Sequence, residues 1–350
     1  MKTIRYALLL CATTLSGLAH AQPAQPTVKP LALSAAEDYA QLARYPQWST
    51  VLEAGATDPM LADRMPSRQT ILGPNGAGPR LTVWASTISA MPGETVTLYA
   101  ALASTATGLR SLVEGVGTAQ SAVSGARVSA ELITQDMGSL GTVSYLDDGV
   151  APDAKAGDGI YVARFTLPSD KTPALGQAES VMVKVTAVLA NEERRQIAGG
   201  FQFSNPAARL TGRYTDVVRD GNLVIAAELD VLAPGRVYLS GTLADVADLP
   251  FATAQAAQVL QPGKQWMELS FYGLAFHDRA VNGAAKLVSV AATSTNGMPN
   301  ALGPVVSNAH VTKTYSLGQF TRASFNEPSL VEAAQRLQID AGIQLAPALQ

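Results

Sequence analysis

The chain has 350 residues, of which 25 are basic and 28 are acidic, giving a formal net charge of −3 at pH 7. No basic block occurs, which excludes a nucleic-acid-binding protein, because such proteins need a concentrated positive surface. Hydrophobic residues make up 47% of the chain and charged residues 15%. This balance excludes general disorder and predicts folded globular domains, with enough length for two of them.

The N-terminus has the pattern of a secretory signal peptide. Lys2 and Arg5 provide a short positive region, residues 6–18 are mostly apolar, and residues 19–21 form a small-x-small cleavage site. The apolar region is shorter than the roughly 20 residues that span a bilayer. We therefore expect residues 1–21 to be removed, so that the mature chain begins at Gln22.

Cleavage at this site changes the net charge of the chain and its cysteine content. It removes two basic residues and no acidic one, so the mature chain has 25 − 2 = 23 basic residues against 28 acidic ones, a net charge of −5. It also removes Cys11, the only cysteine, which excludes disulfides, a catalytic thiol and Cys-ligated zinc. We expect an exported protein, periplasmic or extracellular, with no transmembrane segment after signal cleavage.

Residues 22–79 are expected to form a linker followed by a helical and irregular segment. The first nine of these residues contain three prolines. Ser34 and Glu37 have the spacing of a capping box, and apolar residues follow at helical spacing, which predicts a short helix over residues 34–44. Residues 45–80 show no sustained periodicity, and we expect them to lie across the first domain.

Residues 80–205 show the alternation of apolar and polar residues that is typical of strands. Short runs of this kind are separated by turn signals such as the Pro92-Gly93 dipeptide. The pattern predicts a first immunoglobulin-like β-sandwich. The expected strands cover residues 81–85, 95–102, 127–134, 160–167, 180–190 and 197–203.

Residues 206–322 are predicted to form a second β-sandwich. Pro206 cannot donate to a strand ladder and restricts Asn205 to extended conformations, so the boundary falls there. We expect residues 207–322 to fold on their own. The expected strands cover residues 225–231, 237–243, 266–271, 286–292 and 309–315.

The C-terminal residues 323–350 are expected to form a helix and a tail. Leu330, Ala334 and Leu337 lie at i, i+4 and i+7, which predicts an amphipathic helix within residues 326–340. One interpretation is a helix docked on a face of a sandwich, and the other is a helix that binds a partner. The complete fold class is mainly β: two tandem sandwiches with a short N-terminal helical segment and a C-terminal helix.

An acidic stretch interrupts the strands of the first block. Asp147, Asp148, Asp153 and Asp158 fall within 12 positions, and three glycines among them let the backbone turn back. Ca²⁺ takes 6 to 8 oxygen ligands, so these four carboxylates are candidate calcium ligands. The alternative is a metal-free turn in which the aspartates accept hydrogen bonds from backbone N–H groups. The spacing is not that of an EF-hand loop, and both interpretations remain open.

This stretch resembles a motif of secreted bacterial proteins. It reads LDDG at residues 146–149, then Asp153, GDGIY at residues 157–161 and ARF at residues 163–165. Similar patterns occur in the choice-of-anchor X domain and in immunoglobulin- or fibronectin-like domains beside other extracellular modules. The resemblance implies an exported protein of a mostly uncharacterised family, and it implies no established activity.

The second block resembles the β-sandwich that often follows this domain. The segment that most clearly carries this resemblance is PGRVYLSGTL at residues 234–243. Together the two resemblances cover roughly residues 80–320 and imply two consecutive sandwiches. The C-terminal membrane or sorting anchor that such proteins carry is not recognisable here, so we do not expect surface tethering.

No catalytic constellation is predicted. Only His277 and His310 remain after signal cleavage, neither lies in a recognisable catalytic motif, and no Gly-x-Ser-x-Gly elbow occurs. We therefore expect a non-catalytic binding or structural module whose partner is an unidentified protein or glycan. Calcium would stabilise this module if the acidic stretch binds it. The alternative is a carboxylate-based enzyme acting on glycosides, or a carbohydrate-binding protein.

Three aromatic residues are candidates for contact with a glycan. Trp266, Tyr272 and Tyr238 are expected on the faces of their strands that point away from the core. Exposed aromatic rings can stack on a ligand. The alternative is that these rings pack against a loop or against the neighbouring domain.

Overall fold

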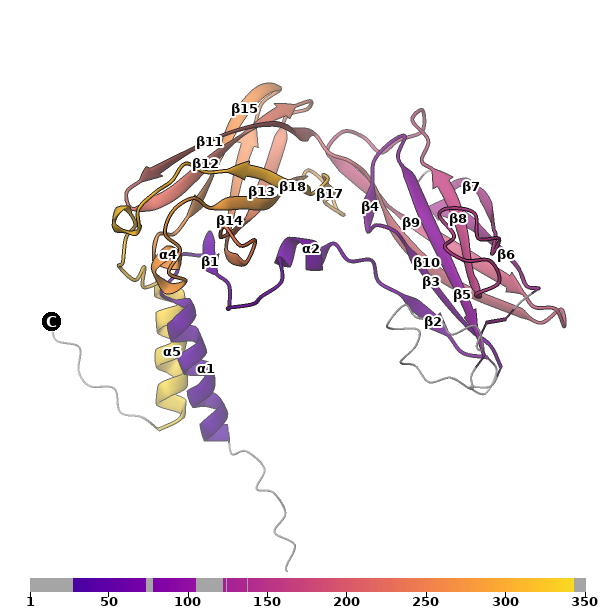
Figure 1. The fold of residues 1–350 in the computed structure, drawn as a ribbon, viewed down its shortest axis with the longest axis horizontal. Helices are drawn as coiled ribbons and strands as arrows, with labels where there is room; N and C mark the ends of the chain where they lie inside the picture. The colour runs from indigo at the N-terminus through magenta and orange to yellow at the C-terminus, as the bar shows by residue number, and fades with distance from the viewer. Residues whose placement is uncertain (1–27, 74–77, 105–121, 124, 137, 343–350) are drawn as a thin grey trace, which may run out of the picture. The chain divides into compact units, whose positions relative to one another are not determined.

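The computed structural model describes residues 28–73, 78–104, 122–123, 125–136 and 138–342. The chain is mainly β, as the sequence predicts, and its strands form four sheets whose neighbours are antiparallel except for one short parallel pair (Figure 1). These sheets make two sandwiches, each with its own hydrophobic core. Both sandwiches belong to one compact unit, residues 44–327, and the helices at the two ends of the chain form another.

The first sandwich packs the sheet β4-β10-β9-β6-β7 against the sheet β2-β3-β5-β8. Strict alternation builds its core: along β9, Val181, Val183 and Val185 are buried, whereas the residues between them face outward. The strands are β2 (Gln69–Ile71), β3 (Arg80–Ala85), β4 (Ser89–Ala90), β5 (Thr95–Ala103), β6 (Arg127–Thr134), β7 (Gly138–Tyr145), β8 (Ile160–Thr166), β9 (Gln177–Val188) and β10 (Arg194–Asn205).

The second sandwich packs the sheet β1-β14-β13-β16-β17, to which β18 adds beside β16, against the sheet β11-β12-β15. The inward positions of β12 follow the same period of two, and Leu223, Ile225 and Leu229 are fully buried there. The strands are β1 (Ser49–Val51), β11 (Ala208–Arg219), β12 (Asn222–Val231), β13 (Gly235–Ala244), β14 (Pro250–Leu260), β15 (Gly263–Phe271), β16 (Lys286–Ser294), β17 (Ala301–Leu302) and β18 (Val306–Val311).

The segment that precedes the first sandwich in sequence packs on the second sandwich. Strand β1 pairs with β14, and Tyr45 is 4% exposed within the second core. The Tyr45 hydroxyl donates to Asp278 Oδ2 at 2.6 Å, and Arg44 forms an ion pair with the same carboxylate. The sequence places residues 45–80 across the first domain, but of their strands only β2 joins the first sandwich.

A short helix, α2 (Pro59–Asp63), follows β1 and lies on the outer face of the same sheet. Its N-cap residue Asp58 accepts from Met60 N, and the same oxygen accepts from the fully buried Thr242 hydroxyl at 2.8 Å. This contact fixes the N-terminal segment to β13. A fragment of residues 207–322 therefore lacks β1, Tyr45 and Asp58, which are integral parts of the second sandwich.

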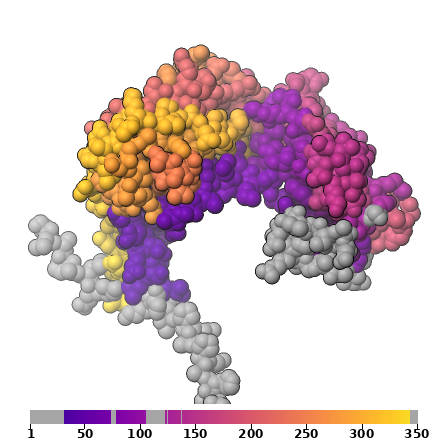
Figure 2. All heavy atoms as spheres, in the orientation of Figure 1, coloured from indigo at the N-terminus to yellow at the C-terminus, as the bar shows by residue number. Residues whose placement is uncertain are grey.

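The helices α1 (Val28–Leu42) and α5 (Pro328–Asp340) lie side by side (Figures 1 and 2). Alanines allow this close packing, because Ala36 and Ala334 are nearly fully buried. The C-terminal helix is thus packed against α1, which the sequence did not predict. Among the described residues, no helix is both long enough and apolar enough to cross a bilayer.

We predict that Tyr45→Ala destabilises the second sandwich by about 3–5 kcal/mol, because it removes a buried aromatic ring and leaves a cavity. Urea denaturation of the mature protein measures this change. Tyr39→Ala, which truncates a 38% exposed ring on α1, is the matched control and should change the unfolding free energy by about 0.5 kcal/mol or less. Equal effects of the two substitutions would contradict the role of the N-terminal segment in the second core.

Candidate functional site

The acidic loop connects β7 to β8 and lies at one end of the first sandwich. A bridge between Leu146 and Val162 closes its base. Three of its glycines have positive φ, and a Cβ on Gly159 (φ +81°) would lie 2.7 Å from Leu102 O. Glycine is required there both for the backbone conformation and for the close approach of β5. The loop therefore turns back on itself, as the sequence predicts.

The carboxylate of Asp147 holds the end of the loop together. Its Oδ1 accepts from Gly157 N at 2.7 Å and from Asp158 N at 3.2 Å, and its Oδ2 accepts from Gly159 N at 3.1 Å. Three successive amides thus converge on one side chain. Hydrogen bonds of this kind are stronger than neutral ones, because the acceptor carries a charge.

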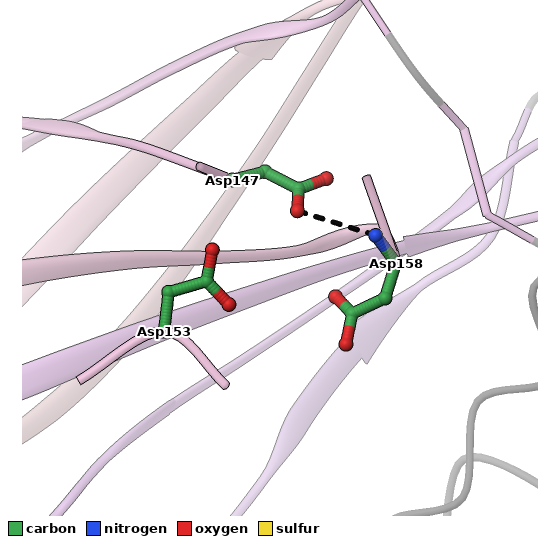
Figure 3. Close-up of side chains that lie close together, drawn as sticks. All are labelled: Asp147, Asp153 and Asp158. Carbon is green, nitrogen blue, oxygen red and sulfur yellow. Dashed lines mark hydrogen bonds between the residues drawn. The ribbon is translucent and has the colours of Figure 1, made fainter. Parts of the chain in front are cut away.

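Two further carboxylates face that of Asp147. One carboxylate oxygen from each of Asp147, Asp153 and Asp158 lies within 4.8 Å of the other two, and Figure 3 shows the three side chains close together. Asp153 is 5% exposed and accepts from Gly149 N and Lys155 N. Asp158 Oδ1 accepts from the amide of the residue two positions later. The structure therefore brings three of the four predicted aspartates together.

Asp148 does not belong to this cluster. Its side chain accepts, through Oδ1, the nearby amide of Val150 at 2.9 Å. This is a local Asx turn, which caps the backbone without contacting the other carboxylates. The adjacent Asp147 and Asp148 point in different directions, and sequence spacing alone does not tell which of the two faces the cluster.

The oxygens of the cluster are already engaged with the backbone. Six amides donate to Asp147, Asp153 and Asp158, and they reach five of the six carboxylate oxygens. These donors offset the mutual repulsion of the three negative charges. Asp147 Oδ1 accepts two amides, and each of the other four engaged oxygens accepts one and keeps a second lone pair. A spacing of up to 4.8 Å suits two oxygens on either side of one Ca²⁺ ion, which binds oxygen at about 2.3–2.6 Å.

Among the three aromatic candidates, Tyr272 is not a surface residue. It is 8% exposed, its hydroxyl donates to Ala323 O at 3.0 Å, and its ring makes edge contacts with Tyr45 and Phe325. Strand β15 ends at Phe271, so the alternation that would turn Tyr272 outward ends there as well. The prediction that this ring points away from the core is wrong, and the alternative, in which the ring packs against a loop, describes its contacts with Ala323 and Phe325.

Trp266 and Tyr238 are exposed, but they do not form one surface. Trp266 is 43% exposed on β15, and Tyr238 is 36% exposed on β13. The two strands belong to the two opposing sheets of the second sandwich, and both rings point away from the core. Each ring has an arginine beside it: Arg213 lies 5.9 Å from the Trp266 ring and Arg236 lies 5.3 Å from the Tyr238 ring.

The two described histidines are held by internal partners. His277, on the short helix α4 (Leu274–Asp278), has its Nε2 3.1 Å from Phe320 O. His310 Nε2 lies 2.7 Å from Asp216 Oδ1. Burial tends to raise the pKa of Asp216, but hydrogen bonds from His310, Tyr315 and a backbone amide outweigh burial and hold this pKa below its usual value.

Comparisons with known proteins give only distant structural similarity. No family model matches the chain, and no curated protein does. The chain is similar to a solved DUF4785 family protein of Legionella pneumophila, with 17% identity, a TM-score of 0.44 and coverage of 69% of this chain. It is also similar to the alpha-2-macroglobulin of E. coli, with 15% identity, a TM-score of 0.31 and coverage of 70%. It spans 58% of the former protein and 14% of the latter.

We predict that Asp147→Ala destabilises the first sandwich by about 2–3 kcal/mol, because three amides lose a charged acceptor. Asp148→Ala is the matched control: it removes the adjacent carboxylate, which lies outside the cluster, and should cost about 0.5 kcal/mol or less. Urea denaturation followed by circular dichroism compares the two variants. A larger effect of Asp148→Ala would show that the loop is held by contacts other than those of Asp147.

Proposed function

We propose that this chain is an exported, non-catalytic module that binds a partner or serves a structural role in the periplasm or at the cell exterior. The observation that carries the proposal is the inward orientation of its reactive groups. The three gathered carboxylates accept backbone amides, and His277 and His310 have internal partners. Groups arranged in this way stabilise loops and sheets and are not directed toward a substrate.

The glycosidase alternative has less support among the described residues. A carboxylic acid that protonates a glycosidic oxygen needs a raised pKa. The carboxyl groups whose pKa is clearly shifted are all shifted downward, by hydrogen bonds from arginine or, at Asp216, by the bonds described above. These groups are Glu193, Asp216, Glu228 and Glu268.

Export rests on the sequence of residues 1–21, which lies outside the described residues. We expect the protein, when expressed in a Gram-negative host, to be recovered from the periplasm or the medium, with a mature chain that begins at Gln22. Cell fractionation and N-terminal sequencing measure both. Cytoplasmic protein that retains Met1, or a lipid attached to Cys11, would contradict this proposal.

The acidic loop leaves two alternatives for the module, a form without metal and a form stabilised by calcium. In the metal-free form the six amides alone balance the carboxylates, and the hydrogen bonds of Asp147, Asp153 and Asp158 support this form. In the calcium form the same three carboxylates would supply part of the 6 to 8 oxygens, with a Kd in the weak extracellular range of about 10⁻⁴–10⁻³ M. The negative charge of the cluster and the spacing of its oxygens fit Ca²⁺, but five of the six carboxylate oxygens already accept a backbone amide.

Thermal melting distinguishes the two forms. For the metal-free loop, which we propose first, the melting temperature should be the same in about 5 mM calcium, on the order of ten times that Kd, and in chelator. For the calcium form it should rise with calcium in the wild type, and Asp158→Asn should lose this rise while Asp148→Asn, outside the cluster, should keep it. A calcium-dependent rise with this pattern would contradict the metal-free proposal and establish the calcium site.

A further inference from the structure

A hollow of about 520 Å³ lies on the second sandwich, where β11 departs from regular pairing with β12. Between the pairs Leu210–Leu229 and Tyr214–Ala227, three residues of β11 face a single residue of β12. Bulges redirect side chains and are frequent next to functional sites. Gly212 lies in the bulge with φ +83°, and a Cβ there would meet nothing within 4 Å, so the backbone itself borders open space.

Arg213 is held beside this hollow by a buried acid. Its Nε donates to Glu228 Oε2 at 2.7 Å, its Nη2 pairs with Glu228 Oε1, and Thr211 donates to the same carboxylate. The side chain of Glu228 is 2% exposed, whereas that of Arg213 is 63% exposed. A guanidinium has five N–H donors, so those not used by Glu228 stay available in a fixed orientation.

An aromatic ring forms the adjoining wall. Trp266 pairs in register with Glu228 on the neighbouring strand, and its ring is 43% exposed. Tyr214 and His310 also line the hollow, and their ring centroids lie 5.9 Å apart. Aromatic walls with a few fixed polar groups are typical of small-ligand sites, and the volume falls within their usual range of about 300–1,000 Å³.

We propose that this hollow binds a sugar ring of a neutral oligosaccharide. A pyranose has an apolar C–H face, which suits the exposed ring of Trp266, and hydroxyl oxygens at its edge, which suit the free N–H donors of Arg213. The charge of Arg213 is already balanced by Glu228, so the hollow favours a neutral sugar over an anion. This inference rests on the proposed function, in which the module binds a partner.

Tyr238 provides a matched control on the opposite sheet. Like Trp266, it is a partly exposed aromatic ring with an arginine beside it. It lies, however, in a regular stretch of β13, where its pairing with Ala257 shows no register shift. A ring that is exposed but not beside a bulge should contribute nothing to binding if the hollow is the site.

The test is calorimetric titration of the mature protein with chitohexaose, cellohexaose and maltohexaose. We expect the wild type to bind at least one of them, Trp266→Ala to weaken binding about tenfold or more, and Tyr238→Ala to leave it unchanged. Arg213→Lys, which keeps the positive charge beside Glu228 but loses the planar donor set, should also weaken binding. Circular dichroism and melting curves establish that each variant is folded.

An NMR measurement on the wild type does not depend on any variant. The chain has three tryptophans, and the indole N–H resonance of Trp266 should shift on addition of the bound oligosaccharide, whereas those of Trp48 and Trp84 should not. Absence of binding to all three sugars would overturn this inference and leave the exported module with a protein partner. Binding that persists in Trp266→Ala, or that is lost in Tyr238→Ala, would overturn the hollow as the site and leave glycan binding intact.

Discussion

The packing of Tyr45 in the second core, together with its hydrogen bond to Asp278, holds the N-terminal segment on the second sandwich. The pairing of β1 with β14 adds to this contact, so that residues 69–205, from β2 to β10, are inserted between two parts of one core. The chain leaves the second sandwich after α2 and returns to it at β11. Contacts that join such distant parts of a sequence form late and slowly, because a long loop must close first. The second core is therefore complete only when both ends of this insertion are in place.

The sequence predicts the strands in which large apolar residues alternate with polar ones. It does not predict the strands in which small or polar residues occupy the inward positions. The pattern of β9 is unambiguous because valines and alanines occupy its inward positions. Strand β7 carries glycines and serines, and β14 is rich in alanine and glutamine, so neither gives a strong period of two. The position of β1 is not predictable from local pattern, since its residues pair with β14 partners such as Ala254, far along the chain from Ser49.

The candidate sites are likewise predictable where they depend on residues close together in the sequence, and not where they depend on backbone torsions or on other strands. The acidic loop is predictable because its aspartates and glycines lie close together in sequence, but the separation of Asp148 from the cluster depends on backbone torsions. The sequence pattern predicts the wrong face for Tyr272, because β15 ends at Phe271 and the alternation of faces does not continue beyond it. The hollow beside Trp266 depends on a bulge in β11, and the sequence indicates it only by a glycine between Thr211 and Arg213.

Most of the charged groups described above serve the fold. Asp147, Asp153 and Asp278 each bind a partner that fixes a loop or a segment. The pair Arg213–Glu228 differs, because the acid is buried while the base remains largely exposed. Burying a carboxylate is costly, so Glu228 needs the hydrogen bonds of Arg213 and Thr211 that compensate its charge. The same contacts fix the position of the guanidinium, which the proposed binding of a sugar requires.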